Sequence, residues 1–207
     1  MNTITYENTS KKCQILIEND PKLKHLFDQV KSVTVKIDDD YYQSLLFTIL
    51  SQQFSSKVAT VIINRFLDYY EGNPLPEKIM MTKEESLRKI GLSYQKISYV
   101  KSLSQHLLDK TVDFSQIEMM TNQEINEMLM KVKGIGPWSI DMFLMFSLGR
   151  EDVFSSLDLG LRNAVKKLYH NENLSQKEIE EISLKWEPYR SIVSHYLWHM
   201  HDQNGKK

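Results

Sequence analysis

The chain has 207 residues, of which 41% are hydrophobic and 26% are charged, enough for one domain or two small lobes with a buried core. Its formal net charge of −1 lacks the positive surplus of many nucleic-acid-binding proteins, so any such contact must come from local placement. The lone Cys13 excludes a disulfide framework, and with no apolar run long enough to span a bilayer and no signal peptide we expect a cytoplasmic protein.

Apolar residues recur at helical spacing along the chain, interrupted by only seven glycines and five prolines. The pair Asp20 and Pro21 is typical of a helix start. Residues 33–37, VTVKI, are predicted to be an extended connector, because DDD closes the segment and no partner strand is evident.

Residues 41–70 are predicted to form two helices that meet near the sequence SQQFSS. Within this segment Phe54, Val58 and Val61 follow helical spacing, so we expect them in the core. A cluster of basic residues over 86–110 is explained equally well by a nucleic-acid contact and by a solvated helix face.

A serine or threonine followed three residues later by glutamate indicates a capping box at a helix start. The chain has three such pairs: Thr82–Glu85, Thr121–Glu124 and Ser175–Glu178. Later helices are predicted near 94–109, 159–170, 175–185 and 189–202. With about ten helices and no convincing sheet, the predicted fold class is all-α.

The stretch KVKGIGPWSIDMF, residues 131–143, breaks two predicted helices with a tight hairpin. Gly134 is placed to end the first helix in a left-handed conformation, and Pro137 to begin the second. The glycines leave backbone N–H groups uncovered beside a helix N-terminus, which suits a phosphate. An ordinary helix–turn–helix corner explains the glycines equally well.

Asp158 follows this hairpin, in the sequence VFSSLDLGLRNAV. With the hairpin, this aspartate resembles those of the helix–hairpin–helix (HhH-GPD) DNA glycosylase superfamily, and in particular the compact form of the 3-methyladenine DNA glycosylase II type. The resemblance runs from about residue 21 to 200 and is carried by five stretches in order: 49–59, 91–103, 132–143, 152–162 and 186–199.

The resemblance implies two helical lobes with a DNA-binding cleft and a helix–hairpin–helix motif near 122–148. The whole chain, 1–207, is then one HhH-GPD-type unit. Its central lobe covers 39–153, and the second lobe covers 1–38 plus 154–207. The implied activity is hydrolysis of the N-glycosidic bond of alkylated purines, such as 3-methyladenine and 7-methylguanine, in base excision repair.

By the same resemblance Asp158 is the catalytic carboxylate that stabilises the cationic sugar. From its spacing alone, capping the helix that begins at Leu159 is the stronger interpretation, and the two roles are compatible. Two other carboxylates compete for the role. Asp141 is expected to be buried and hydrogen-bonded, and Asp152 to be solvated.

The resemblance places Trp138, Met142 and Trp198 in the base pocket, where an indole would stack on a cationic purine. Two core tryptophans are the alternative. Met142 stands where some relatives have an aromatic residue, which leaves the lesion range open. Bifunctional relatives carry a lysine at the position of Trp138, so we expect a monofunctional enzyme that does not cut the strand.

The remaining predicted contacts are with double-stranded DNA. Gln53 matches the wedge that fills the space left by a flipped base. Phe54 is the alternative wedge, although its spacing favours the core. Further DNA contacts are expected at Gln52, Ser55, Gly134, Ile135 and Gly136. No cofactor and no catalytic metal are expected, apart from a structural monovalent cation at the hairpin. The protein is expected to be a monomer.

Two other functions stay open from the sequence. One is a glycosylase for a different lesion, such as an oxidised or deaminated base. The other is a non-catalytic DNA-damage-binding module on the same fold, although the weak net charge disfavours a protein that depends on phosphate attraction alone.

Overall fold

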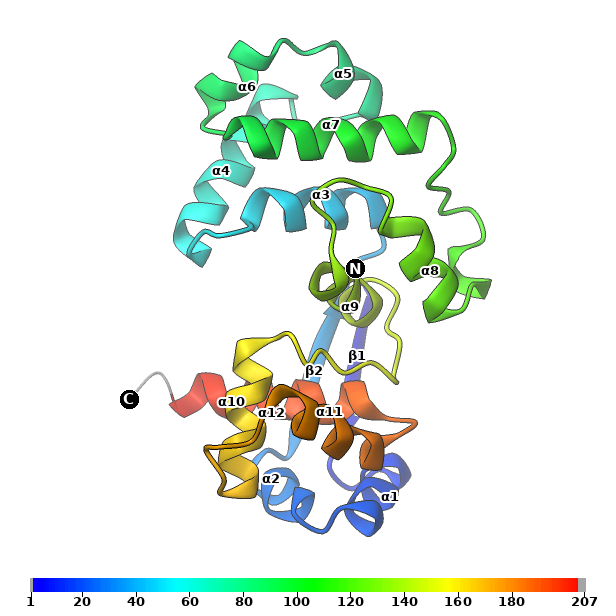
Figure 1. Ribbon diagram of the computed structural model, residues 1–207, viewed down its shortest axis with the longest axis vertical. Coiled ribbons are helices and arrows are strands. Elements are labelled where there is room, and N and C mark those ends of the chain that lie inside the picture. The colour runs from blue at the N-terminus through cyan, green and yellow to red at the C-terminus, as the bar shows by residue number, and fades with distance from the viewer. Residues whose placement is uncertain (1, 205–207) are drawn as a thin grey trace. The chain divides into compact units, whose positions relative to one another are not determined.

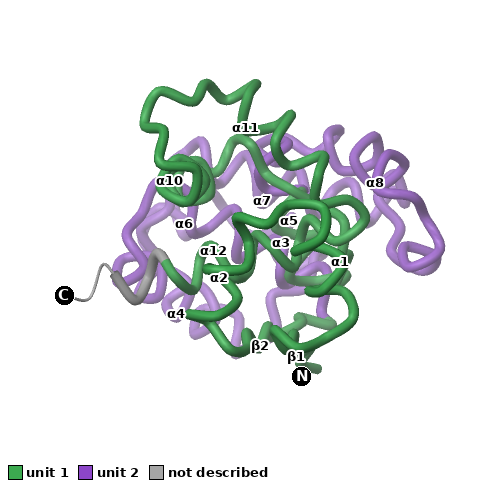
Figure 2. Tube along the Cα trace, turned by 90° about the horizontal axis from the view of Figure 1, so that it is seen from below, with its two compact units in different colours: residues 1–39, 141–207 green, residues 40–140 purple. Residues whose placement is uncertain are grey.

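The computed structural model describes the backbone of residues 2–204 and the side chains of residues 2–200. It is mostly helical, and two compact units divide the chain. Unit 1 contains residues 1–39 and 141–207, and unit 2 contains residues 40–140 (Figure 2). Residues 141–153, which the sequence suggested for the central lobe, therefore group with unit 1. None of the described helices is both long and apolar enough to cross a membrane.

Unit 1 contains a two-stranded antiparallel sheet, formed by β1 (Asn2–Glu7) and β2 (Ser32–Ile37). The prediction that 33–37 is a connector is wrong, because the N-terminal segment supplies the partner strand. Tyr6 lies opposite Val33, and both side chains are buried. The two strands show the alternation of a half-buried sheet, but one alternating segment alone does not reveal its partner.

Helices complete unit 1 around one core (Figure 1). They are α1 (Lys11–Asn19), α2 (Leu23–Gln29), α10 (Leu159–Tyr169), α11 (Gln176–Ser183) and α12 (Arg190–Asn204), with a 3₁₀ turn η2 (Leu184–Trp186). The core includes the fully buried Trp186, Phe27 and Tyr196. Asp20, also buried, accepts hydrogen bonds from the Trp186 indole at 2.9 Å and the Tyr169 hydroxyl at 2.5 Å. Asp20 therefore ties α10 and η2 to the chain just before α2.

All regular elements described in unit 2 are helices. These are α3 (Tyr41–Ser51), α4 (Ser56–Tyr69), α5 (Pro76–Met81), α6 (Glu84–Ile90), α7 (Tyr94–Leu108), a 3₁₀ turn η1 (Ile117–Met119) and α8 (Asn122–Leu129). Helix α3 packs on α4 and α7 and buries Leu45, Leu46, Ile49 and Leu50. The helix α9 (Pro137–Phe146) begins in unit 2 and continues into unit 1.

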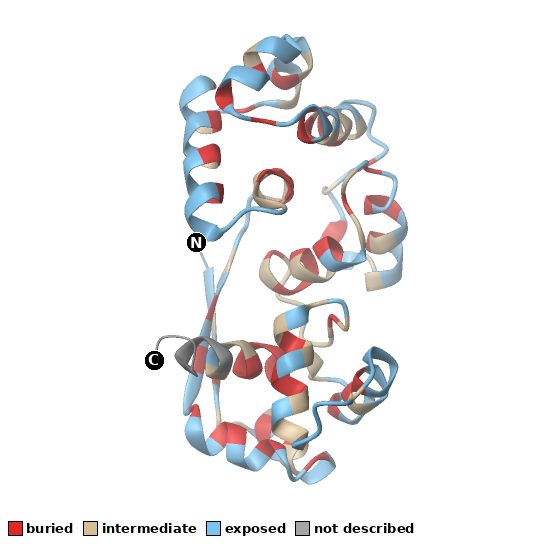
Figure 3. Cartoon of the chain, turned by 60° about the vertical axis from the view of Figure 1, so that its left-hand side comes forward, coloured by how far each residue is buried: buried red, intermediate tan, exposed pale blue. Residues whose placement is uncertain are grey.

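The expected core positions Phe54, Val58 and Val61 are exposed by 38%, 44% and 43%, so that prediction is wrong. Phe54 lies before α4 begins, and a helical period cannot be counted through it. The buried face of α4 is instead formed by Ala59, Ile62 and Phe66, and burial is confined to one face of this helix (Figure 3).

Two of the three capping boxes are confirmed, at Thr121–Glu124 and Ser175–Glu178. The third is wrong, because Lys83 is the N-cap of α6. The Thr82 hydroxyl instead donates to the carbonyl of Lys78 at 2.7 Å and accepts from the Tyr70 hydroxyl at 3.0 Å. Thr82 thus ends α5, and its side chain is unavailable to begin α6.

Candidate functional site

The predicted hairpin lies in unit 2, between α8 and α9. Helix α8 ends at Leu129, earlier than the apolar stripe suggested, and turns lead from there to Gly134. Gly134 has φ of 86°, in the left-handed region as predicted. A Cβ atom at this residue would lie 2.2 Å from the Tyr99 ring. Glycine is therefore required both for the backbone conformation and for the close approach of α7.

Side chains of α7 hold the segment that leads into the hairpin. A ring nitrogen of His106 lies 2.9 Å from the carbonyl oxygen of Lys131, and the Ser102 hydroxyl accepts the amide of Lys133 at 3.0 Å. These supports were not predicted from the sequence, because polar residues at helical spacing do not reveal what they contact.

The two glycine amides of the hairpin make no hydrogen bond among the described residues. Ile135 is 4% exposed and anchors the hairpin, while a Cβ atom at Gly136 would meet no neighbour within 4 Å. Uncovered amides directly before helix α9 form a suitable site for a phosphate oxygen. The geometry of the hairpin is therefore compatible with binding of an anion.

A second feature of unit 2 is the turn of residues 51–54, between α3 and α4. Gln52 has φ of −49° and ψ of 134°, Gln53 has φ of 61°, and the Phe54 amide donates to the Ser51 carbonyl at 3.1 Å. This is a type II turn with an exposed glutamine at the position that favours glycine. A left-handed non-glycine residue costs about 1–3 kcal/mol, which often marks a functional position.

This turn and the hairpin are directly connected within unit 2. The Gln52 side-chain amide donates to the carbonyl of Gly134 at 2.7 Å. Ser55 is the N-cap residue of α4, but its side chain makes no capping hydrogen bond. Gln52, Gln53, Ser55 and the hairpin glycines, all predicted DNA contacts, thus belong to one connected surface region.

Asp158 lies in unit 1 as the N-cap residue of α10. Its Oδ1 accepts from the Leu161 amide at 2.8 Å and from the Trp198 indole nitrogen at 3.1 Å. The half-buried carboxyl group is thereby oriented by its own helix and by α12. A Cβ atom at Gly160 would lie 3.1 Å from Oδ1, so the absence of a side chain there leaves room for this arrangement.

Trp198 lies in an aromatic cluster of unit 1. Its ring centroid is 5.6 Å from Phe146 and 5.8 Å from His195. Burial lowers the pKa of His195 to about 4, so this histidine is neutral near pH 7. A groove of about 400 Å³ is lined by these three residues, His199 and residues 33–36 of β2. A predicted base-pocket residue therefore lies at a hollow and also holds Asp158.

The other two predicted pocket residues lie on α9. Trp138 is 39% exposed, which excludes a core role for this tryptophan. Met142 is half-buried one turn later. The third tryptophan, Trp186, is fully buried and packs in the core of unit 1.

The two carboxylates that compete with Asp158, Asp141 and Asp152, each lie beside other side chains of the protein. Asp152 is partly exposed, but its carboxylate also pairs with Arg190 through bonds of 2.7 Å and 3.0 Å, which the sequence did not predict. Burial raises the pKa of Asp141 to about 6, against the opposing effects of Ser155 and Arg190. The Ser155 hydroxyl lies near this carboxyl group but has no hydrogen-bond partner of ordinary geometry.

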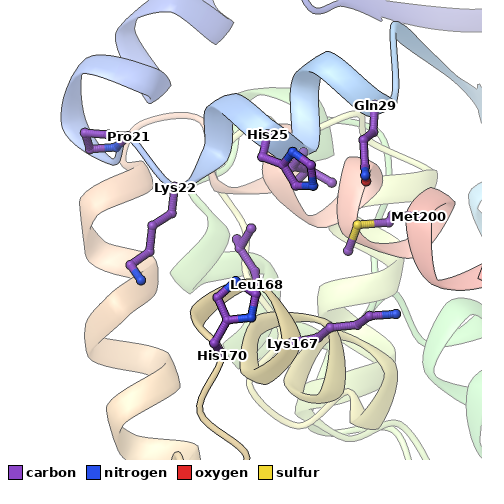
Figure 4. A pocket seen from close by; sticks show the side chains of 9 residues that line it. Pro21, Lys22, His25, Gln29, Lys167, Leu168, His170 and Met200 are labelled. Atoms are coloured by element: carbon purple, nitrogen blue, oxygen red, sulfur yellow. The ribbon is translucent and has the colours of Figure 1, made fainter.

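A second hollow in unit 1, of about 430 Å³, lies between α2 and α10. Basic residues of its lining are Lys22, His25, Lys167 and His170. The two lysine side chains extend toward opposite sides (Figure 4), and the Lys22 ammonium lies 4.7 Å from the Tyr169 ring centroid. Its positive charges do not converge, and none of the predicted site residues lines it.

The chain is similar in sequence to a known protein family and to individual members of it. Residues 46–188 match the family described as HhH-GPD superfamily base excision DNA repair protein. The Bacillus subtilis relative YfjP is 30% identical over 184 residues, which are 85% of this chain and 64% of that protein, so the chain spans just under two thirds of its length.

Two solved structures are also similar. The crystal structure of a DNA-3-methyladenine glycosidase from Bacillus halodurans has a TM-score of 0.90 and 30% identity, and the match covers 99% of this chain and 95% of that chain. The Schizosaccharomyces pombe 3-methyladenine DNA glycosylase Mag1, in complex with abasic DNA, has a TM-score of 0.80 and 30% identity, with 91% and 95% covered.

Proposed function

Because the chain belongs to the HhH-GPD superfamily of base excision DNA repair proteins, we propose that it is a monofunctional DNA glycosylase for alkylated purines. Its substrates would be bases such as 3-methyladenine and 7-methylguanine in double-stranded DNA. The observation that carries this proposal is the carboxyl group of Asp158, which the Leu161 amide and the Trp198 indole hold in one orientation.

In the proposed reaction the damaged nucleotide leaves the stack, because its glycosidic bond is inaccessible inside a duplex. An alkylated purine is already cationic and leaves without strong acid assistance. As the bond breaks, positive charge develops on the sugar, and the Asp158 carboxylate stabilises it. An opposing charge at about 4 Å contributes roughly 4 kcal/mol at an effective dielectric near 20. That corresponds to about a thousandfold in rate. Water then adds to the sugar carbon and gives up a proton to the Asp158 carboxylate, which completes the hydrolysis and leaves a neutral free base and an abasic site.

The residue at position 138 supports a reaction without strand cleavage. Bifunctional glycosylases require an amine that attacks the sugar carbon and forms a Schiff base. Tryptophan has no such nucleophile, and its exposed indole suits stacking on a cationic purine instead. The product would be an intact strand with an abasic site.

The hairpin would bind the DNA backbone through the amides of Gly134 and Gly136. Two further hairpin carbonyl groups, of Lys133 and Ile135, accept no hydrogen bond from any described residue. They fit the role of holding a monovalent cation beside a phosphate. Gln53 would fill the space left by the flipped base, and the protein would act as a cytoplasmic monomer.

The test is base release from methylated duplex DNA by the wild type and by Asp158→Asn. Asparagine also caps helices, so we expect a folded protein with unchanged DNA affinity and a release rate lower by about a thousandfold. Asp113→Asn, an exposed carboxylate in a turn of unit 2, is the matched control.

Two results would contradict the proposal. If the wild type binds damaged DNA but releases no base, and Asp158→Asn binds equally well, the protein is a binding module. If the wild type cuts the abasic strand and is trapped on DNA by borohydride, the enzyme is bifunctional. A panel of duplexes with oxidised, deaminated and alkylated bases determines the lesion range.

A further inference from the structure

One lysine of unit 2 is buried beneath the turn of residues 51–54. Lys96, in the first turn of α7, is 7% exposed. Its ammonium nitrogen donates to the carbonyl oxygen of Leu50 at 2.6 Å and lies 3.4 Å from the centroid of the Phe54 ring. Fully buried lysines are rare, so both contacts need an explanation.

The two contacts lie on opposite sides of Gln53. Leu50 belongs to the last turn of α3, where backbone carbonyl groups have no partner within the helix and attract a cation. Phe54 follows Gln53 directly, and its ring face attracts the same ammonium group. Lys96 therefore joins the residue at the end of α3 to the residue just beyond the apex of the turn. Helix α7 packs on α3 and can supply this side chain from a fixed position (Figure 1).

The conformation of Gln53 makes such a support necessary. Its left-handed backbone is unfavourable for glutamine, so contacts from outside the turn must hold it. The Gln52 side chain fixes the turn to Gly134 of the hairpin, and Lys96 fixes it to α7.

We propose that Lys96 is a positioning residue for base flipping, which holds the 51–54 turn so that Gln53 projects as the wedge. This inference rests on the proposed glycosylase function, since a wedge has a role only when a base leaves the stack. Lys96 does not touch the reacting atoms in this proposal. Its ammonium group acts through the carbonyl of Leu50 and the ring of Phe54.

Base release from two substrates distinguishes a positioning role of Lys96 from a purely structural one. A wedge matters when a paired, stacked base must leave a duplex, and much less when the damaged base is in a single strand. Loss of the ammonium group should therefore slow base release from a duplex selectively. Loss of general stability would lower release from both substrates.

The experiment compares single-turnover release of 7-methylguanine from a duplex, opposite cytosine, with release from the same strand alone. For Lys96→Met we expect release from the duplex to fall by about tenfold and release from the single strand to stay within about twofold. Gln53→Ala should show the same selective loss. Lys96→Arg, which keeps a cation, should recover part of it. Lys89→Met, at an exposed position of α6, should leave the ratio of the two rates unchanged.

Phe54→Leu keeps the test valid if Lys96→Met does not fold. Phe54 is 38% exposed, and leucine removes the aromatic ring while Lys96 stays in place. We expect a smaller loss that is again selective for the duplex. An unchanged rate ratio in the folded Lys96 and Phe54 variants, with an active wild type, would overturn the role of Lys96 alone. A wild type that releases no methylated base from either substrate would overturn the glycosylase function, and the role of Lys96 with it.

Discussion

The two turns that carry the proposed chemistry are held in different ways. Asp158 in unit 1 is oriented largely by the helix that it caps, with one further bond from Trp198. Gln53 in unit 2 depends on side chains from other elements, namely Lys96 of α7 and the bond from Gln52 to the hairpin. The first arrangement is mostly local in sequence and the second is tertiary. Substitutions should therefore affect the first turn through the rate of bond cleavage, and the second through stability, DNA binding and base release from a duplex.

The largest effect on the tertiary arrangement is expected from Gly134→Ala. The new methyl group would meet the Tyr99 ring and the backbone would stay at an unfavourable φ. We expect the free energy of unfolding to fall on the order of 3 kcal/mol. Affinity for abasic DNA should fall with it, because the hairpin moves. The free energy of unfolding is measured by denaturant titration.

Gly72→Ala is the matched control for this substitution. Gly72 has φ of 78°, but a Cβ atom there would meet nothing within 4 Å. This variant isolates the backbone contribution, which should be about 1 kcal/mol. Equal losses at the two glycines would show that Tyr99 does not hold the hairpin.

Trp198→Phe tests the tertiary hydrogen bond from the Trp198 indole to Asp158. Phenylalanine keeps an aromatic ring but lacks the indole N–H donor, and a hydrogen bond to a charged group contributes about 1.5–3 kcal/mol. We expect base release to slow by at least about tenfold at saturating enzyme. Tyr169→Phe removes a hydroxyl donor to Asp20 and should alter stability alone. A rate equal to the wild type would show that helix capping is enough to orient Asp158.

A rise in pH should change the free energy of unfolding and the preference for duplex release in opposite directions, because both depend on the charge of Lys96. Burial lowers the pKa of Lys96 from 10.5 to about 8, and no charged neighbour contributes to this shift. Between these two values the unfolded chain binds more protons at this residue, so its contribution to the free energy of unfolding rises with pH. The positioning cation is lost over the same range, so the preference for duplex release should decline.

The comparison between pH 7.5 and 9.5 uses the wild type and Lys96→Met, since other groups titrate equally in both proteins. The variant should lack the stability increment at the higher pH and should show a constant ratio of duplex to single-strand release. A wild-type ratio that does not change across this range would mean that the ammonium charge is not needed.

The smallest expected effect comes from Gln53→Gly. Glycine adopts the left-handed conformation without strain, so we expect the free energy of unfolding to rise by about 1 kcal/mol. Release from the duplex should nevertheless slow, because the wedge side chain is gone. A variant less stable than the wild type would show that the Gln53 side chain makes stabilising contacts of its own.

The sequence predicted what depends on neighbours along the chain. The capping boxes at Thr121 and Ser175, the left-handed Gly134 and the capping role of Asp158 all follow from residues a few positions apart. The all-α class followed from helical spacing, and family membership from motifs in the expected order. Whether Asp158 is catalytic stays a prediction.

The features that the sequence did not predict depend on distant partners. Strand β2 pairs with β1, about thirty residues earlier, and neither strand is evident alone. Lys96 belongs to the basic cluster over 86–110, and its sequence neighbours do not predict that the fold buries it against Leu50. The spacing of Phe54 with Val58 and Val61 predicted a core position, but Phe54 lies in the turn before α4 and is not part of that helix.

The solitary Cys13 has a practical consequence. Its thiol is fully buried, and burial raises its pKa, so reagents that require an accessible thiolate should not modify the native protein. A second cysteine introduced by Gln53→Cys, at an exposed position, would then be the one reactive thiol of the folded chain. A fluorophore or a disulfide-forming oligonucleotide attached there would report directly on whether this turn enters the helix of damaged DNA.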